Sequence, residues 1–374
     1  GVSGIEKSFD YELTTSNKPL KLSLDTEIQY LIREELIKFQ EIFNSYGSTA
    51  ILMNVNSGEI LSMVSLPDFD LNKREDISDK KFINRSTKGV YELGSVFKTF
   101  TLAAGLQQNV IQEDTLFKNL PKKIKCAGRS ISEYDMDIPS SLTAEEILIR
   151  SGNIGSIKIA QKVGLENFKD FLENLDLLNK IQFDIEEVGN PIPFKWGKCK
   201  LATSAYGHGI TTTPLQLAKA YAIIANGGYK IKPTLIKKEK NLKRGEQIIT
   251  QENSNKINEI LRKIVTSEQG TANLANIAGY EIAGKTGTAQ KSIKGKYSKK
   301  KINTFASIFP ISSPKYVLIV LLDEPKLSET YIYEYNDGKK RKIIGTPFNT
   351  AGWTSVEVAK NIIEKIGPIL AIKY

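Results

Sequence analysis

The stretch SVFKTFTLAAGL, residues 95–106, decides our prediction of the fold. It is apolar on nearly every helical face except at Lys98. A helix of this kind is buried inside a domain, so we expect a central helix around which the other elements pack. The longest unbroken apolar run of the chain, Tyr316 to Leu322, is much shorter than the roughly 18 residues that a membrane-spanning helix needs.

Strand patterns near both ends of the chain enclose a long block of helical patterns. This order predicts an α/β (α+β) fold in which an all-α subdomain, roughly residues 107–270, is inserted into a sheet-containing domain. The predicted strands are residues 48–55, 59–64, 280–290, 304–309 and 316–323. The predicted helices are residues 22–43, capped by Asp25, and residues 143–150, 154–163, 166–178, 214–226, 254–267 and 354–367. We expect a loop at residues 67–90 and a solvated hairpin turn at the lysine-rich residues 291–301.

Composition limits the chemistry. The chain has 374 residues, enough for two or three compact units. Its 52 basic and 42 acidic residues give a net charge of +10, which favours anionic partners or reflects a lysine-rich composition. The single histidine, His208, excludes a metal site with two or three histidine ligands, and we expect it to pack in a loop. For Cys126 and Cys199 we favour two buried thiols over one disulfide.

Ser95 and Lys98 form an S-x-x-K motif on the predicted central helix. The spacing puts the hydroxyl and the amine on one face, within hydrogen-bond reach. Ser95 lies at the helix N-terminus, where the helix dipole favours negative charge, and apolar surroundings should lower the pKa of Lys98 so that it can act as a base. The structural alternative is a core helix whose lysine reaches solvent. The same spacing recurs outside apolar helices at Ser78–Lys81, Ser298–Lys301 and Ser312–Lys315.

Ser151-Gly-Asn153 is an S-x-N motif between two helical patterns. In one interpretation Ser151 simply caps the following helix. In the functional interpretation its hydroxyl relays a proton and the Asn153 amide binds an amide of the substrate.

Lys285-Thr-Gly-Thr288 is a K-T-G motif inside a strand pattern. Alternation along a strand places Lys285 and Gly287 on one face, and a glycine inside a strand often marks the close approach of a ligand or of another backbone. Lys285 could bind a carboxylate, and the backbone N–H of Thr288 could bind an oxyanion. The structural alternative is a strand near a turn with an incidental lysine.

Together, S-x-x-K, S-x-N and K-T-G in this order resemble penicillin-binding proteins and serine β-lactamases. Over residues 21–374 the chain resembles the transpeptidase domain of class B penicillin-binding proteins, of the division-specific FtsI type. Residues 1–20 resemble the end of the non-catalytic pedestal domain that precedes it. Gly152 departs from relatives that carry Ser or Asp there. The resemblance is carried by residues 89–106, 150–160, 205–228, 283–290 and 345–359.

The resemblance implies a five-stranded antiparallel sheet flanked by helices, and it implies roles for the motif residues. Ser95 attacks the carbonyl between the two terminal D-alanines of a peptidoglycan stem peptide, and Lys98 takes its proton. The backbone N–H groups of Ser95 and Thr288 form the oxyanion hole. Ser151 and Lys285 relay a proton to the leaving D-alanine, and an amine from a neighbouring stem then forms the cross-link.

Substrate binding is implied for Asn153, which holds an amide of the stem peptide, and for Thr286, Gly287 and Thr288, where the terminal carboxylate binds beside Lys285. The resemblance implies no cofactor, no metal and no nucleic acid. The implied partners are stem peptides, β-lactams and membrane proteins of the division machinery, including a glycosyltransferase. We expect a single-pass anchor ahead of this sequence in the bacterial inner membrane, with the catalytic domain periplasmic.

Three other functions use the same motifs. A serine β-lactamase hydrolyses its acyl-enzyme, and a D-Ala-D-Ala carboxypeptidase passes the acyl group to water. A β-lactam sensor domain is acylated without being an enzyme. The pedestal-like start and the resembling stretches favour the transpeptidase.

Overall fold

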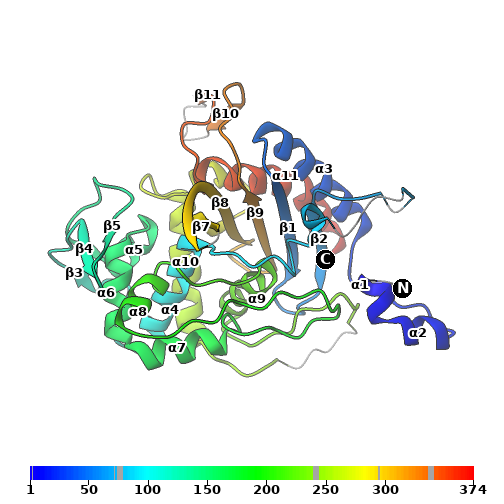
Figure 1. The fold of residues 1–374 in the computed structure, drawn as a ribbon, viewed down its shortest axis with the longest axis horizontal. Helices are drawn as coiled ribbons and strands as arrows, with labels where there is room; N and C mark the ends of the chain where they lie inside the picture. The colour runs from blue at the N-terminus through cyan, green and yellow to red at the C-terminus, as the bar shows by residue number, and fades with distance from the viewer. Residues whose placement is uncertain (2, 71, 74–78, 239–243, 294, 336–340) are drawn as a thin grey trace.

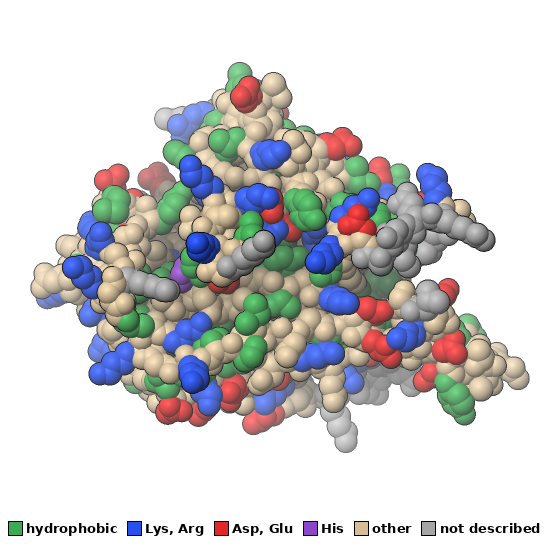
Figure 2. Space-filling model, in the orientation of Figure 1, with side chains coloured by type: hydrophobic (Ala, Val, Ile, Leu, Met, Phe, Trp, Pro, Cys, Tyr) green, Lys and Arg blue, Asp and Glu red, His purple; other side chains and the backbone are tan. Residues whose placement is uncertain are grey.

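The computed structural model of this chain describes residues 1, 3–70, 72–73, 79–238, 244–293, 295–335 and 341–374. A sheet covered by helices stands beside a mostly helical lobe (Figure 1). Among the described residues, no helix is long and apolar enough to cross a membrane. On the face shown in Figure 2, basic side chains are spread among acidic ones rather than gathered in one patch.

The sheet has five strands in the order β2-β1-β9-β8-β7, and every neighbouring pair is antiparallel. This confirms the sheet that the resemblance implies. The central strand, β9, is the long apolar run, and all of its residues are buried because helices cover both faces. The K-T-G motif lies on β7, at the edge of the sheet. The strands are β1 (Gly47–Asn54), β2 (Ile60–Leu66), β7 (Ala283–Ile293), β8 (Lys296–Phe309) and β9 (Tyr316–Asp323).

Helices from both ends of the chain, α3 (Thr26–Ile42) and α11 (Ser355–Lys373), pack together on one face of the sheet. The predicted cap of α3 is confirmed, because the Asp25 carboxylate accepts hydrogen bonds from the N–H groups of Glu27 and Ile28. The opposite face is covered by α9 (Pro214–Ala225), which contacts β1, β8 and β9.

The predicted central helix is confirmed, but its first turn is tighter than expected. Residues Gly94–Phe97 form a 3₁₀ helix, η2, and the α-helix α4 runs from Lys98 to Gln107. Every residue from Lys98 to Leu106 is buried. The helix α4 packs against α5, α6, α7 and α10 of the lobe.

The lobe is not all-α, so that part of the prediction is wrong. It contains two small two-stranded sheets, which pair β3 with β6 and β4 with β5. Strands of two to four residues are too short to show a period of two, and the sequence pattern therefore missed them. The elements of the lobe are β3 (Leu116–Phe117), β4 (Lys123–Cys126), β5 (Arg129–Ser132), β6 (Leu142–Thr143), α5 (Ala144–Ile149), α6 (Asn153–Val163), α7 (Leu165–Asn174), α8 (Lys198–Ser204) and α10 (Gln251–Thr266).

Cys126 and Cys199 form a disulfide, so the expectation of two buried thiols is wrong. Their Cα atoms lie 5.6 Å apart although 73 positions separate them in the chain. The bond ties β4 to α8. Spacing along the sequence could not show this contact, because it depends on how the lobe folds.

The lysine-rich residues 291–301 belong mostly to strands rather than to a turn. Strand β7 continues to Ile293 and β8 begins at Lys296, while residue 294 lies outside the described residues. Lys291 is paired with Asp323 at 2.7 Å and with Glu324 at 2.8 Å, so the charge of this run is partly neutralised.

The remaining elements are short. The segment before α3 forms two short helices, and a hairpin that the sequence did not predict follows β9. These elements are α1 (Gly4–Ser8), α2 (Asp10–Thr15), η1 (Lys80–Phe82), η3 (Asn273–Ala275), β10 (Ile332–Tyr335), β11 (Arg341–Ile344) and η4 (Ala351–Trp353).

Candidate active site

Glycines allow the segment that carries Ser95 to lie directly on β7. A Cβ atom at Gly94 would lie 2.8 Å from the carbonyl oxygen of Thr288, and Gly94 itself has a φ of +63°. A Cβ atom at Gly287 would collide with the carbonyl oxygen of Leu93. The Ser95 segment and β7 can therefore lie this close only because Gly94 and Gly287 carry no side chain. A glycine inside a strand, here Gly287, predicted such a close backbone approach.

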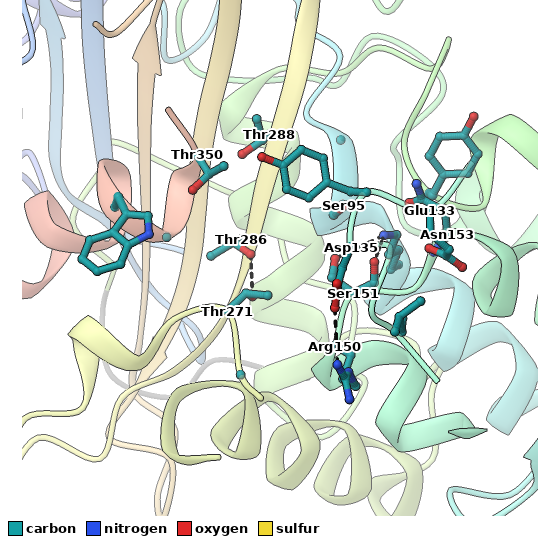
Figure 3. Close-up of a pocket in the computed structure, with 18 of the residues that line it drawn as sticks. Ser95, Glu133, Asp135, Arg150, Ser151, Asn153, Thr271, Thr286, Thr288 and Thr350 are labelled. Carbon is teal, nitrogen blue, oxygen red and sulfur yellow. Dashed lines mark hydrogen bonds and ion pairs between the residues drawn. The ribbon is translucent and has the colours of Figure 1, made fainter. Parts of the chain in front are cut away.

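Ser95 and Lys98 both line one cleft of about 840 Å³, between β7 and the helical lobe (Figure 3). The expected hydrogen bond between them is not formed among the described residues. Instead, the Lys98 amine donates to the carbonyl oxygen of Ser151 at 2.5 Å and to its hydroxyl at 3.2 Å. Burial lowers the pKa of Lys98 to about 7, while the nearby Glu133 carboxylate opposes this shift. Lys98 is 2% exposed, so it does not reach solvent as a surface lysine would.

Ser151 connects the two lysines of the motifs. Its hydroxyl also accepts a hydrogen bond from the Lys285 amine at 2.9 Å. Its backbone has a φ of +59°, a left-handed conformation that non-glycine residues rarely adopt and that is concentrated at functional sites. Gly152, not Ser151, is the N-cap residue of α6. The capping interpretation of Ser151 is therefore wrong, because the turn directs its hydroxyl toward the lysines.

Lys285 lies behind the wall of the cleft. Its side chain is fully buried and donates to Ser151 and, at 3.2 Å, to the carbonyl oxygen of Thr286. Burial lowers the pKa of this amine well below its ordinary value, and the positive charge of Lys98 lowers it further. Direct contact between Lys285 and a substrate carboxylate is therefore not available in this conformation.

Thr286 and Thr288 face the cleft from β7, whereas Lys285 and Gly287 do not line it, as strand alternation predicts. The Thr286 hydroxyl lies 2.7 Å from the Thr271 hydroxyl. The Thr288 hydroxyl accepts a hydrogen bond from the N–H of Ala351 at 2.9 Å. Because that bond uses only a lone pair, the hydroxyl hydrogen of Thr288 remains available to a ligand.

Asn153, the first residue of α6, is held from the β4–β5 hairpin. Its side-chain N–H donates to the carbonyl oxygen of Ser132 at 2.9 Å. The Glu133 carboxylate accepts hydrogen bonds from the backbone N–H groups of Asn153, at 2.6 Å, and Ile154, at 2.8 Å. Sequence reasoning missed Glu133, because it precedes Asn153 by 20 positions and no neighbouring residue marks it as a helix cap.

Of the motif residues, Ser95, Lys98, Ser151, Asn153, Thr286 and Thr288 line the cleft. Among the other S-x-x-K matches, Ser298 and Ser312 do not line it, and Ser78 lies outside the described residues. His208 also lines the cleft and stacks on Tyr206 and Tyr297, with ring centroids 5.8 and 4.6 Å away. The three motifs, far apart in sequence, therefore meet at one site.

The comparisons agree with this geometry. The family model of the penicillin binding protein transpeptidase domain matches residues 48–349, and the chain belongs to this family. It is 31% identical over its whole length to the probable peptidoglycan D,D-transpeptidase FtsI of Caulobacter vibrioides, covering 63% of that protein. It is 29% identical over 88% of its length to the peptidoglycan D,D-transpeptidase FtsI of Escherichia coli, covering 60% of that protein.

A solved structure shows the same fold. The TP domain of penicillin-binding protein 3 from Burkholderia pseudomallei superposes with a TM-score of 0.80 at 25% identity, over 94% of this chain and 97% of that one. The resemblance stated from the motifs is thus confirmed at the level of the family.

Proposed function

We propose that this chain is the catalytic domain of a peptidoglycan D,D-transpeptidase, which cross-links stem peptides through a serine acyl-enzyme and releases D-alanine. The observation that carries the proposal is the meeting of the three motifs: the hydroxyl of Ser151 lies between two buried amines, Lys98 and Lys285, beside the cleft that Ser95 lines. Covalent catalysis by serine needs an adjacent base, and a desolvated amine can serve as one.

Acylation begins with attack of the Ser95 oxygen on the carbonyl carbon between the two terminal D-alanines. Lys98 in its neutral form accepts the hydroxyl proton, and its pKa of about 7 makes this form abundant near neutral pH. The negative charge that develops on the carbonyl oxygen is stabilised by the backbone N–H groups of Ser95 and Thr288. The close packing of η2 on β7 holds these two segments together.

The leaving D-alanine needs a proton when the peptide bond breaks. The Ser151 hydroxyl supplies it and is reprotonated by Lys98 or Lys285, both of which it contacts. An amine of a second stem peptide then attacks the ester carbonyl and forms the new amide. Neutral Lys98 accepts a proton from this amine and returns it to the oxygen of Ser95 as the ester bond breaks. Water in place of this amine would give hydrolysis.

The cleft offers hydrogen-bonding groups to the stem peptide that donates the acyl group, here called the donor strand. One N–H of the Asn153 side-chain amide donates to the carbonyl oxygen of Ser132, and the side-chain oxygen of Asn153 is left for an amide N–H of the stem peptide. The hydroxyls of Thr286 and Thr288 face the cleft and bind the terminal carboxylate, whereas Gly287 contributes by letting the Ser95 segment pack directly on β7.

The cellular setting is proposed from the relatives. Two of them carry the name FtsI, which supports a role in septal wall synthesis with a glycosyltransferase and other membrane proteins of division. We propose that residues 1–20 end a pedestal domain and that a single-pass anchor in the inner membrane precedes it. β-Lactams, which mimic the donor strand, acylate Ser95.

The test separates transfer from hydrolysis. The domain is incubated with a thioester analogue of a D-alanyl donor and a D-amino acid acceptor, and products are separated by chromatography. We expect an aminolysis product that increases with acceptor concentration, and nitrocefin consumption that stops after about one equivalent, as for a stable acyl-enzyme. Repeated nitrocefin turnover would show a β-lactamase, and hydrolysis alone at all acceptor concentrations would show a carboxypeptidase.

A further inference from the structure

Glu133 stands at the point where the β4–β5 hairpin meets the Ser151–Asn153 turn (Figure 3). It directly follows β5 and is 7% exposed. The first N–H groups of a helix have no partner within the helix and need an acceptor from elsewhere. Gly152 at the N-cap has no side chain to offer. Glu133 fills this place, since its two carboxylate oxygens accept from Asn153 and Ile154.

The hairpin that carries Glu133 is closed at its base by a backbone hydrogen bond and tied to the lobe at its other end by a disulfide. The backbone N–H of Glu133 donates to the carbonyl oxygen of Lys122 at 2.9 Å, which closes the hairpin. The disulfide between Cys126 and Cys199 ties the same hairpin to α8. The backbone around Glu133 is therefore held by its own hairpin, whose far end is linked covalently to α8, and not only by the helix that Glu133 caps.

Glu133 is also the acidic group that acts on Lys98. The Lys98 amine and the Lys285 amine, which comes from β7, both bond to the Ser151 hydroxyl. Glu133 is the nearby carboxylate whose negative charge acts on Lys98. The other charged side chains along the cleft are the Asp135–Arg150 ion pair, at 3.3 Å, and Glu268 and Lys301. A carboxylate near two buried amines stabilises positive charge that burial would otherwise remove.

We propose that Glu133 is a positioning residue of the acylation site: it fixes the Ser151–Asn153 turn by capping α6 and sets the charge balance at Lys98. This inference rests on the proposed function, because its effect is measured through acylation of Ser95. Without the carboxylate, the turn loses the acceptor that holds its backbone and Lys98 loses its opposite charge.

Two different effects follow when Glu133 is changed to Gln. The rate of acylation falls about 10–100-fold, because a small displacement of the groups around Ser95 is costly. The pKa of Lys98 falls further, because the burial that lowers it is no longer opposed. If neutral Lys98 is the base, the acidic limb of the pH profile therefore moves to lower pH.

The experiment measures the second-order rate constant for acylation by a fluorescent penicillin across pH, for wild type, Glu133→Gln and Glu133→Asp. The matched control is Glu146→Gln. Glu146 is also a capping carboxylate, but of the neighbouring helix α5, where it lies in the first turn and accepts from the N–H of Thr143 at 2.7 Å. Thermal unfolding shows whether each variant is folded.

We expect Glu133→Gln to be acylated more slowly than wild type, with the acidic limb of its pH profile at lower pH. Glu133→Asp should also be acylated more slowly, but with the acidic limb at the wild-type pH. The control, Glu146→Gln, should match wild type in both respects. A Glu133→Gln variant with wild-type rate and limb overturns the inference, and so does a lower rate with an unmoved limb. If Glu133→Gln does not fold, the Glu133→Asp profile decides: an unmoved limb with a lower rate supports the inference, and a moved limb overturns it. Failure of the wild type to be acylated would instead overturn the proposed function.

Discussion

Replacing Gly287 by Ala should push the Ser95 segment away from β7 while leaving every polar group of the cleft in the chain. A Cβ atom built at Gly287 lies 2.2 Å from the carbonyl oxygen of Leu93 and 3.0 Å from a side-chain carbon of Val96. Both neighbours belong to the segment that carries Ser95, because Leu93 lies two positions before it and Val96 directly after it. The first is backbone, so it cannot turn aside as a flexible side chain would.

The size of the effect follows from this distance. Real Cβ atoms essentially never approach another heavy atom within 3.0 Å, so the contact must lengthen by roughly 0.8 Å. A misplacement of about 1 Å can cost about 10²-fold in rate when reacting groups must be aligned. Overpacking of this kind costs typically 1–3 kcal/mol of stability. We therefore expect acylation by penicillin to slow by about 10²-fold in a protein that is still folded.

The assay is the second-order rate constant with a fluorescent penicillin, together with chemical unfolding. Gly197→Ala is the matched control, because a Cβ atom at Gly197 meets nothing within 4 Å and its φ of 171° is ordinary extended backbone. We expect wild-type acylation from the control. A Gly287→Ala variant that is acylated as fast as the control would refute the argument that η2 must lie directly on β7.

Three further predictions concern charge and cross-linking. Acylation should increase as pH rises through about 7, the pKa to which burial lowers Lys98, because only the neutral amine accepts a proton; a flat pH profile would contradict this. Changing both Cys126 and Cys199 to Ser should lower the free energy of unfolding by about 2–4 kcal/mol in chemical denaturation, because the disulfide closes a long loop. A reducing agent should lower the unfolding free energy of wild type by the same amount and leave that of the variant unchanged. Asp323→Asn should cost about 3–5 kcal/mol of unfolding free energy, because the almost fully buried Arg85, 3.6 Å away, loses its opposite charge and Lys291 loses one of its two partners. An exposed control, Asp79→Asn, should change the unfolding free energy little.

The parts of the fold that the sequence predicted are those where the signal is local. The central helix and β9 are continuous apolar stretches, and Asp25 begins α3 by bonding to N–H groups two and three residues later. Such patterns depend only on neighbouring residues. The short strands β3 to β6 have no such length, and their pairing depends on the fold of the lobe.

The features of the site also divide into those that the sequence predicts and those that only the fold determines. The motifs could be found because each is a short group of residues, and their shared cleft follows from the family resemblance. The bond from Lys98 to Ser151 instead of Ser95, the burial of Lys285 behind β7 and the cap from Glu133 all depend on contacts between distant segments. Spacing along the chain carries no information on these contacts.

The central claim is that Ser95 is the nucleophile, and intact-mass spectrometry after incubation with benzylpenicillin tests it most directly. Wild type should gain the mass of one penicillin molecule, and peptide mapping should place it on Ser95. Ser95→Ala, which keeps Lys98, Ser151 and Lys285, should gain none. An adduct of equal yield on Ser95→Ala, or one mapped to Ser151 in wild type, would contradict the account.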